Sequence, residues 1–295
     1  MQFQFLIWNI LFSSFFILCV KWVQRRDGWD VVTVGCINYV AAAFCALPGY
    51  WYSEPSAASI HANWTGATMG GCYFVAFFFL IYAVRWVGAS NTAAVSRLAL
   101  VIPIAVGILY WGEQAGVFQL IGIGVAMASL FMVGMSAQQQ ERVAQVASPD
   151  LPRVGPLLKI MVLGCFFLIC GVTRVAQQTC KMLSDGAVDY PSFLFFAFVV
   201  ASIPSIVILV VRRQKLSCWE VVIGSVLGAT NILQSHFILL SLDYYKSVVV
   251  FPITSAGGLV FTALAAVFLL HEKLNFASTM GVILAAISIC LLQIS

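Results

Sequence analysis

The chain has 295 residues, of which 62% are hydrophobic and 9% charged, and its mean hydropathy is +0.99. Soluble globular proteins carry about 25% charged residues, so this composition excludes a soluble domain and indicates a membrane protein with many spans. The net charge of +4 is small and gives no sign of a nucleic-acid partner.

Apolar stretches of about 20 residues recur along the chain, each long enough for a helix to cross a bilayer. Helices satisfy their backbone hydrogen bonds in lipid, and the stretches lack the alternation of barrel strands. Pro103 and Pro252 each remove one helix hydrogen bond, which permits a bend. The sequence therefore predicts an all-α integral membrane protein with ten transmembrane helices, near residues 3–23, 31–50, 64–86, 91–111, 116–135, 157–181, 191–211, 219–241, 247–270 and 276–294.

Residues that punctuate the first half recur in the second half at a nearly constant distance. The pairs, 156–159 residues apart, are Asp27 and Asp185, Gly28 and Gly186, Pro48 and Pro204, Gly71 and Gly228, Glu113 and Glu272, and Gly122 and Gly281. The pattern predicts a duplication, with one five-helix repeat at 1–135 and a second at 157–295. The polar, proline-containing segment 136–156 is the expected linker loop.

Basic residues divide unevenly between alternate loops. Lys181 and Lys246 fall on one side of the expected membrane, and Arg97 and Arg174 lie within spans. By the positive-inside rule, the richer side is cytoplasmic and both termini lie outside. Since each repeat has five spans, the repeats are expected to be inverted, an arrangement that secondary transporters use. The cytoplasmic set is Lys21, Arg25, Arg26, Arg85, Arg142, Arg153, Lys159, Arg212, Arg213, Lys215 and Lys273.

Two stretches resemble the drug/metabolite transporter superfamily, EamA-type branch. One runs from Ser96 to Pro103 and continues in Trp111-Gly112-Glu113 and Gly122-Ile123-Gly124-Val125; the other comprises Phe251-Pro252-Ile253, His271-Glu272-Lys273-Leu274 and Gly281-Val282. The resemblance implies a ten-helix basket that moves small metabolites by alternating access. Members include exporters of amino acids and other metabolites, and relatives carry sugar phosphates or nucleotide sugars.

The resemblance has two departures and one implication for location. Many members have cytoplasmic termini, whereas the charge distribution here places them outside. Small multidrug-resistance relatives use a glutamate in the middle of the first helix, where this chain has Asn9, Ser13 and Ser14. This disfavours antiport of cationic drugs by that mechanism. The resemblance also implies a bacterial inner membrane.

Two arginines within spans are candidate binding residues, because ionisable groups in a bilayer are costly. Arg174 lies in a polar run with Thr173, Gln177 and Gln178, and Arg97 lies one turn before Pro103. A guanidinium keeps its proton and binds carboxylates or phosphates. The alternative for each is that its side chain reaches the headgroups.

The eighth span carries a polar stripe of Asn231, Gln234 and Ser235 on one face, with His236 at its edge. Substrate binding and hydrogen bonding between helices both explain such a stripe. His236 is either a proton carrier or a packing residue. The residues that correspond to this stripe in the first repeat are Phe74, Phe77 and Phe78, which are expected to form an aromatic wall of the site. Asn9 and Asn38 are further expected lining residues.

No acidic residue lies centrally in a span, which favours an anionic or zwitterionic substrate. We therefore predict a secondary transporter that exports a small amino-acid-like or anionic metabolite. A sugar-phosphate or nucleotide-sugar exchanger, and a receptor or scaffold without transport, are the alternatives. His61, His236 and His271 are scattered, which argues against an enzyme.

The expected partners are a small-molecule substrate, a coupling proton or counter-substrate, and the lipid bilayer, with no nucleic acid. The sequence leaves the oligomeric state open. The nine cysteines show no C-x-x-C spacing, and only Cys218 lies in a loop. They are interpreted as packing residues, so neither a metal nor a cofactor is expected.

Overall fold

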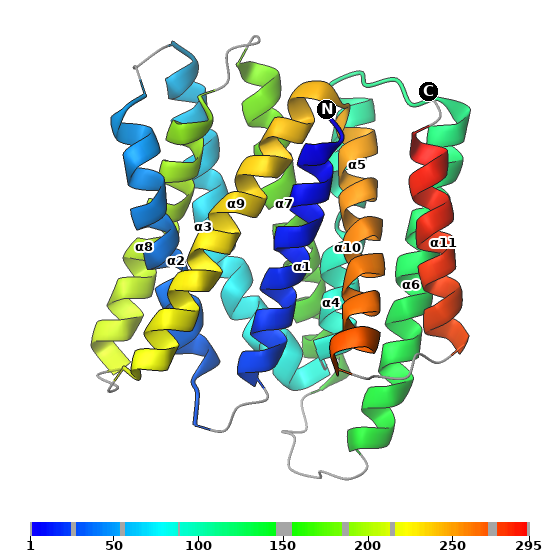
Figure 1. Ribbon diagram of the computed structural model, residues 1–295, viewed down its shortest axis with the longest axis horizontal. Coiled ribbons are helices and arrows are strands. Elements are labelled where there is room, and N and C mark those ends of the chain that lie inside the picture. The colour runs from blue at the N-terminus through cyan, green and yellow to red at the C-terminus, as the bar shows by residue number, and fades with distance from the viewer. Residues whose placement is uncertain are drawn as a thin grey trace. The chain divides into compact units, whose positions relative to one another are not determined.

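The computed structural model is built from α-helices, and the residues it describes contain no strand (Figure 1). It describes residues 2–24, 28–53, 57–87, 89–145, 155–184, 189–212, 216–270 and 276–293. The predicted all-helical fold is confirmed. The helices are α1 (Gln4–Gln24), α2 (Val31–Trp51), α3 (Ala57–Val87), α4 (Ala89–Leu98), α5 (Val101–Leu109), α6 (Val117–Gln145), α7 (Pro156–Leu183), α8 (Tyr190–Arg212), α9 (Cys218–Tyr244), α10 (Ser247–Leu270) and α11 (Phe276–Leu292).

Six of these helices are long and apolar enough to cross a membrane, namely α2, α3, α7, α8, α9 and α10. Shorter apolar stretches lie in α1, across α4 and α5, in α6 and in α11. Each stretch falls on one of the expected spans. The inversion of the two repeats remains a prediction.

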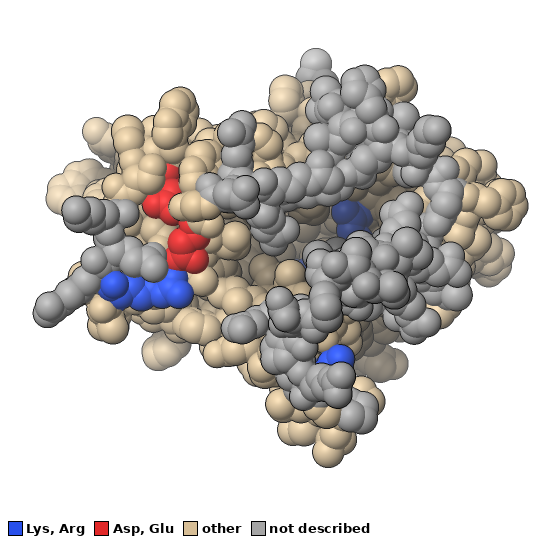
Figure 2. Space-filling model, turned by 90° about the horizontal axis from the view of Figure 1, so that it is seen from below, with Lys and Arg blue, Asp and Glu red and all other residues tan. Residues whose placement is uncertain are grey.

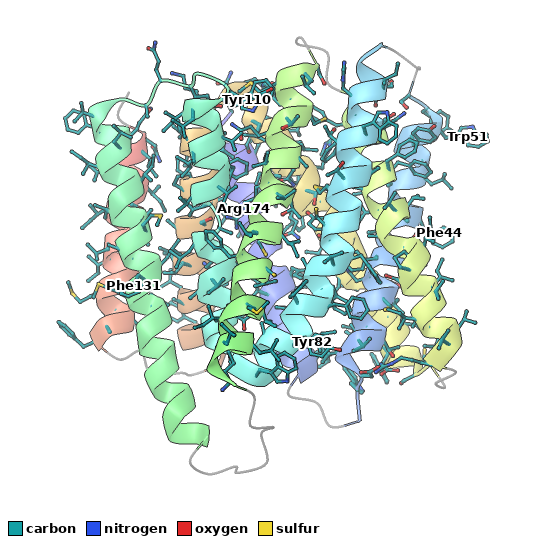
Figure 3. The ribbon with its side chains drawn as sticks, turned by 180° about the vertical axis from the view of Figure 1, so that it is seen from behind. Phe44, Trp51, Tyr82, Tyr110, Phe131 and Arg174 are labelled. Carbon is teal, nitrogen blue, oxygen red and sulfur yellow. The ribbon has the colours of Figure 1, made fainter. Side chains whose placement is uncertain are left out.

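The outer surface of the helices is apolar, and charge gathers at helix ends. Phe44, Trp51 and Phe131 point outward from their helices (Figure 3) and are 70%, 78% and 59% exposed. Acidic and basic side chains adjoin on the end face seen in Figure 2. This distribution suits helices whose sides contact lipid while their ends meet the headgroups.

The fourth expected span, 91–111, is wrong as a single helix, because the chain breaks at Ala99 and Leu100 between α4 and α5. Pro103 has no N–H for the carbonyl of Ala99, four residues earlier. The amide of Ile102 donates to that carbonyl instead, at 3.2 Å, and the amide of Leu100 donates to Arg97 O at 3.2 Å. The interruption near Pro103 is therefore short, since Leu100 keeps helical backbone angles, whereas α10 continues through Pro252 without one.

The expected linker loop is in part helical. Residues 136–145 continue α6, whereas residues 146–154 lie outside the described residues.

The chain forms two compact units, and each unit draws on both halves of the sequence. Unit 1 comprises Met1–Phe74 and Thr173–Tyr245, and unit 2 comprises Val75–Val172 and Lys246–Ser295. Unit 1 therefore contains α1, α2, α8 and α9 whole, with parts of α3 and α7. The boundaries of the predicted sequence repeats remain a prediction.

Glycines allow close helix packing in unit 1. Gly66 and Gly70 of α3 contact the backbone of Phe193 and Ala197 in α8. Gly224 of α9 packs on Ile37 of α2. A Cβ at Gly228, one turn further along α9, would lie 2.6 Å from the Asn38 carbonyl oxygen. Small residues let membrane helices approach to this distance.

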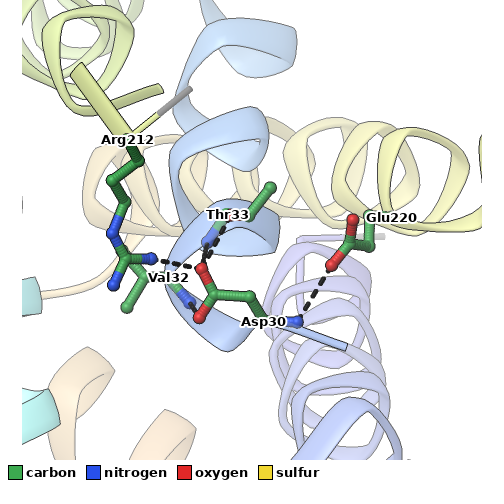
Figure 4. Close-up of polar contacts among 5 residues, drawn as sticks. All are labelled: Asp30, Val32, Thr33, Arg212 and Glu220. Atoms are coloured by element: carbon green, nitrogen blue, oxygen red, sulfur yellow. Dashed lines mark hydrogen bonds and ion pairs between the residues drawn. The ribbon is translucent and has the colours of Figure 1, made fainter. Parts of the chain in front are cut away.

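Acidic side chains fix the starts of the unit 1 helices. Asp30 accepts hydrogen bonds from the amides of Val32 and Thr33 at the start of α2, and it pairs with Arg212 at the end of α8 (Figure 4). Glu220 of α9 accepts from the Asp30 amide at 2.9 Å. These contacts satisfy amides that a helix start otherwise leaves unpaired.

A first prediction follows from the glycine packing. Gly70→Ala places a methyl group against the Ala197 backbone and should destabilise the protein by about 1–3 kcal/mol, through overpacking. Thermal unfolding in detergent measures the effect. The matched control is Gly71→Ala, since nothing lies within 4 Å of a Cβ there. Equal unfolding temperatures for the two variants would contradict the α3–α8 packing.

Candidate functional site

Buried amide side chains from α1, α2 and α9 form a hydrogen-bonded chain in unit 1. Asn9 Nδ2 donates to the Gln234 backbone carbonyl at 2.7 Å. Gln234 Nε2 donates to Asn231 Oδ1 at 2.8 Å, and Asn231 Nδ2 donates to Asn38 Oδ1 at 3.4 Å. We call Asn9, Asn38, Asn231 and Gln234 the amide array. The structure thus brings Asn9 and Asn38 into contact with the polar stripe that the sequence predicted on α9.

Two tyrosines connect the same α9 face to α2 and α3. Tyr39 OH donates to the Tyr73 carbonyl at 3.2 Å, and the two rings stack with centroids 6.3 Å apart. The Tyr73 hydroxyl lies 3.5 Å from Ser235 Oγ. The polar stripe on α9 therefore meets three neighbouring helices, α1 and α2 through amides and α3 through Tyr73.

Tyr73 is a candidate that the sequence reasoning missed. An offset of 157 pairs Asn231 with Phe74, whereas the offset of 158 given by Asp27 and Asp185 pairs it with Tyr73. The offset between the predicted repeats varies by a few residues, so it did not single out Tyr73.

His236 lies beside the array and contacts aromatic rings. Its ring meets Tyr190 edge to face at 6.3 Å and Phe237 at 5.9 Å. The side chain is half-buried. These contacts hold the imidazole by packing, next to the polar stripe of α9.

Arg174 lies in the middle part of α7 (Figure 3), within unit 1. Its side chain is half-buried, and its neighbours Thr173, Gln177 and Gln178 are buried. A guanidinium on such a polar helix face can hold a carboxylate or phosphate through two parallel hydrogen bonds.

Arg97 belongs to unit 2 and is held on α10. Its Nη1 donates to the Ser255 carbonyl at 3.1 Å, and its Nη2 donates to Thr262 Oγ1 at 3.3 Å. It lies in the last turn of α4, where the helix dipole favours a cation. Arg97 thus links α4 to α10 by two hydrogen bonds.

The three predicted wall phenylalanines fall in different units. Phe74 closes the α3 segment of unit 1, whereas Phe77 and Phe78 belong to unit 2. Phe77 is buried and meets Phe78 at a steep ring angle, with centroids 6.4 Å apart.

Glu113 of unit 2 is buried at the start of α10. It accepts from the Ser247 hydroxyl at 2.7 Å and from the amides of Ser247 and Val248 at 3.2 and 3.1 Å. Its repeat counterpart Glu272 lies outside the described residues. In the part of the chain that the structure describes, no group of three His, Cys, Asp or Glu residues could hold a metal ion.

Comparisons with known proteins agree with this architecture. A solved structure titled only "Crystal structure of protein" has a TM-score of 0.71 to this chain at 12% identity, covering 99% of this chain and 96% of its own. Such low identity shows a shared fold alone. None of the curated proteins matches the sequence.

The family comparison concerns the first half of the chain. Residues 3–135 match the model of the EamA-like transporter family. Proteins of this family are membrane transporters rather than enzymes, which implies a small-molecule substrate and a lipid environment. The match over residues 3–135 agrees with the predicted resemblance to the drug/metabolite transporter superfamily, and together with the apolar helices it supports an integral, multi-pass membrane protein.

Proposed function

We propose that the protein is a secondary transporter that exports a small amino-acid-like or anionic metabolite by alternating access. The observation that carries the proposal is the concentration of polar side chains in unit 1, where Asn9, Asn38 and Asn231 are only 5%, 3% and 6% exposed. Polar groups inside membrane helices commonly mark a substrate path. The match of residues 3–135 to a transporter family model supports the same interpretation.

We further propose that its ten spans form two inverted five-helix repeats. Contacts that recur at the repeat distance support this. Thr33 N donates to Asp30 at the start of α2, and Ser192 N donates to Asp189 at the start of α8, 159 residues later. In unit 2, Gly122 packs on Leu292, and Gly281, 159 residues after Gly122, packs on Val133.

The residues take distinct roles in this proposal. Arg174 of unit 1 binds the negative group of the substrate. Gln234 and His236 orient the substrate or couple its movement to a proton or counter-substrate. Phe74 of unit 1 contributes an apolar wall.

The role of Arg174 predicts which ligands stabilise the protein. Thermal shift with amino acids, organic acids, phosphorylated metabolites and quaternary amines should show stabilisation by an anionic or zwitterionic class. At a ligand concentration of about 100 times Kd the gain is about 2.7 kcal/mol, because the ligand binds only the folded state. Arg174→Gln should abolish the shift.

The control is Arg174→Lys, which keeps the charge but loses the planar fork, and should retain part of the shift. Stabilisation by quaternary amines, or equal shifts in wild type and Arg174→Gln, would contradict an anion site at Arg174.

The proposed orientation, with the termini outside a bacterial inner membrane, is testable by labelling. Cys218, expected in a loop, is the first residue of α9 and is exposed, directly after the basic segment that holds Arg212, Arg213 and Lys215. In a variant with the other eight cysteines replaced, an impermeant maleimide should label Cys218 only from the cytoplasmic side. Lys246→Cys, in the same background without Cys218, should be labelled only from outside. The reverse pattern would contradict the orientation.

A further inference from the structure

The amide array leaves polar atoms open at its ends. Among the described residues, Asn38 Nδ2, Asn9 Oδ1 and Gln234 Oε1 have no hydrogen-bond partner, although Asn38 and Asn9 are only 3% and 5% exposed. Exchanging N and O in the Asn38 amide would still leave one open atom. None of these three atoms is among the described polar atoms that are fully buried without a partner, so a ligand can reach each of them and complete its hydrogen bonding.

The open atoms include both a hydrogen-bond donor and hydrogen-bond acceptors. Asn38 offers a donor, whereas Asn9 and Gln234 each offer an acceptor. Among the described residues, none of the array's hydrogen bonds involves a charged group. The neighbouring side chains Tyr39, Tyr73 and Ser235 also carry neutral hydroxyls. A ligand group that matches this set must donate and accept while carrying no charge.

We propose that the amide array binds an uncharged group of the substrate that both donates and accepts hydrogen bonds, with a carboxamide as the matching chemistry. It discriminates against a carboxylate in the same position. A carboxylate only accepts hydrogen bonds, so it would face the acceptor oxygens of Asn9 and Gln234 without a donor of its own. It would also lose its hydration inside a neutral membrane site.

This inference rests on the proposed function, since it names the chemistry of one part of the substrate at that site. Arg174 would bind the negatively charged group of a zwitterion, and the amide array would form hydrogen bonds with its uncharged group. The two claims fail separately. The anion site fails if Arg174→Gln keeps the ligand shift, and the array fails if carboxamides have no advantage.

The test uses pairs of ligands that differ only as carboxamide and carboxylate. The pairs are glutamine and glutamate, asparagine and aspartate, and nicotinamide and nicotinate, titrated by calorimetry into the purified full-length protein. At least one carboxamide should bind about tenfold more tightly than its carboxylate partner. Asn38→Asp replaces the open donor by an acceptor and should weaken carboxamide binding by about tenfold or more.

The matched control is Gln119→Glu. It makes the same amide-to-acid change at a buried residue of unit 2, where Gln119 Oε1 accepts from the Gly116 amide at 3.1 Å. This variant should leave the preference unchanged. Should Asn38→Asp fail to fold, Asn38→Ala removes the donor without adding charge and should give the same loss. The proposal is overturned if carboxylates bind as tightly as their carboxamides, if no carboxamide binds, or if the Asn38 variants keep the wild-type preference.

Discussion

Inside a bilayer, every polar group must find its partner within the protein, and the rest of this structure depends on that constraint. It explains why the described spans are helical. It also explains how the break in the fourth span is tolerated, because the Ala99 carbonyl that Pro103 leaves unpaired accepts from Ile102. In the same way, the Ser255 carbonyl and the Thr262 hydroxyl accept hydrogen bonds from Arg97. At the ends of the amide array, where side-chain atoms stay open, we propose that a ligand supplies the partner.

Short connections between spans leave helix starts with unpaired amides close to the membrane surface. Carboxylates meet this need in both units. Asp30 and Asp189 cap α2 and α8, and Glu113 caps α10 from the end of a neighbouring span. Among the acidic side chains that the structure describes, Asp30, Glu113, Asp189 and Glu220 lie where helices begin. The middle parts of the described apolar spans carry no carboxylate, and this suits a substrate that brings its own negative charge.

The sequence predicted the helices well because hydropathy and span length are local properties. Hydrogen-bond partners between helices are not local. Asn9 and Gln234 are 225 residues apart, and nothing in either segment indicates that they meet. Tyr73 was missed because an aromatic residue in an apolar span has no distinguishing pattern of its own. The break at Ala99 and Leu100 was not predicted, because it depends on which amide pairs with the Ala99 carbonyl. The extension of α6 to Gln145 was not predicted either, because its last residues are polar and composition assigns such a stretch to a loop.

The central claim is that the polar side chains of α9 bind substrate and do not merely join helices. Counterflow of radiolabelled amino acids in proteoliposomes, measured for wild type and Gln234→Met beside their unfolding temperatures, tests it most directly. We expect saturable exchange in wild type and a loss of about tenfold or more in the variant, with little change in unfolding temperature. An unfolding temperature that falls sharply while the folded variant keeps its exchange would contradict the claim, and would make the stripe a purely structural contact.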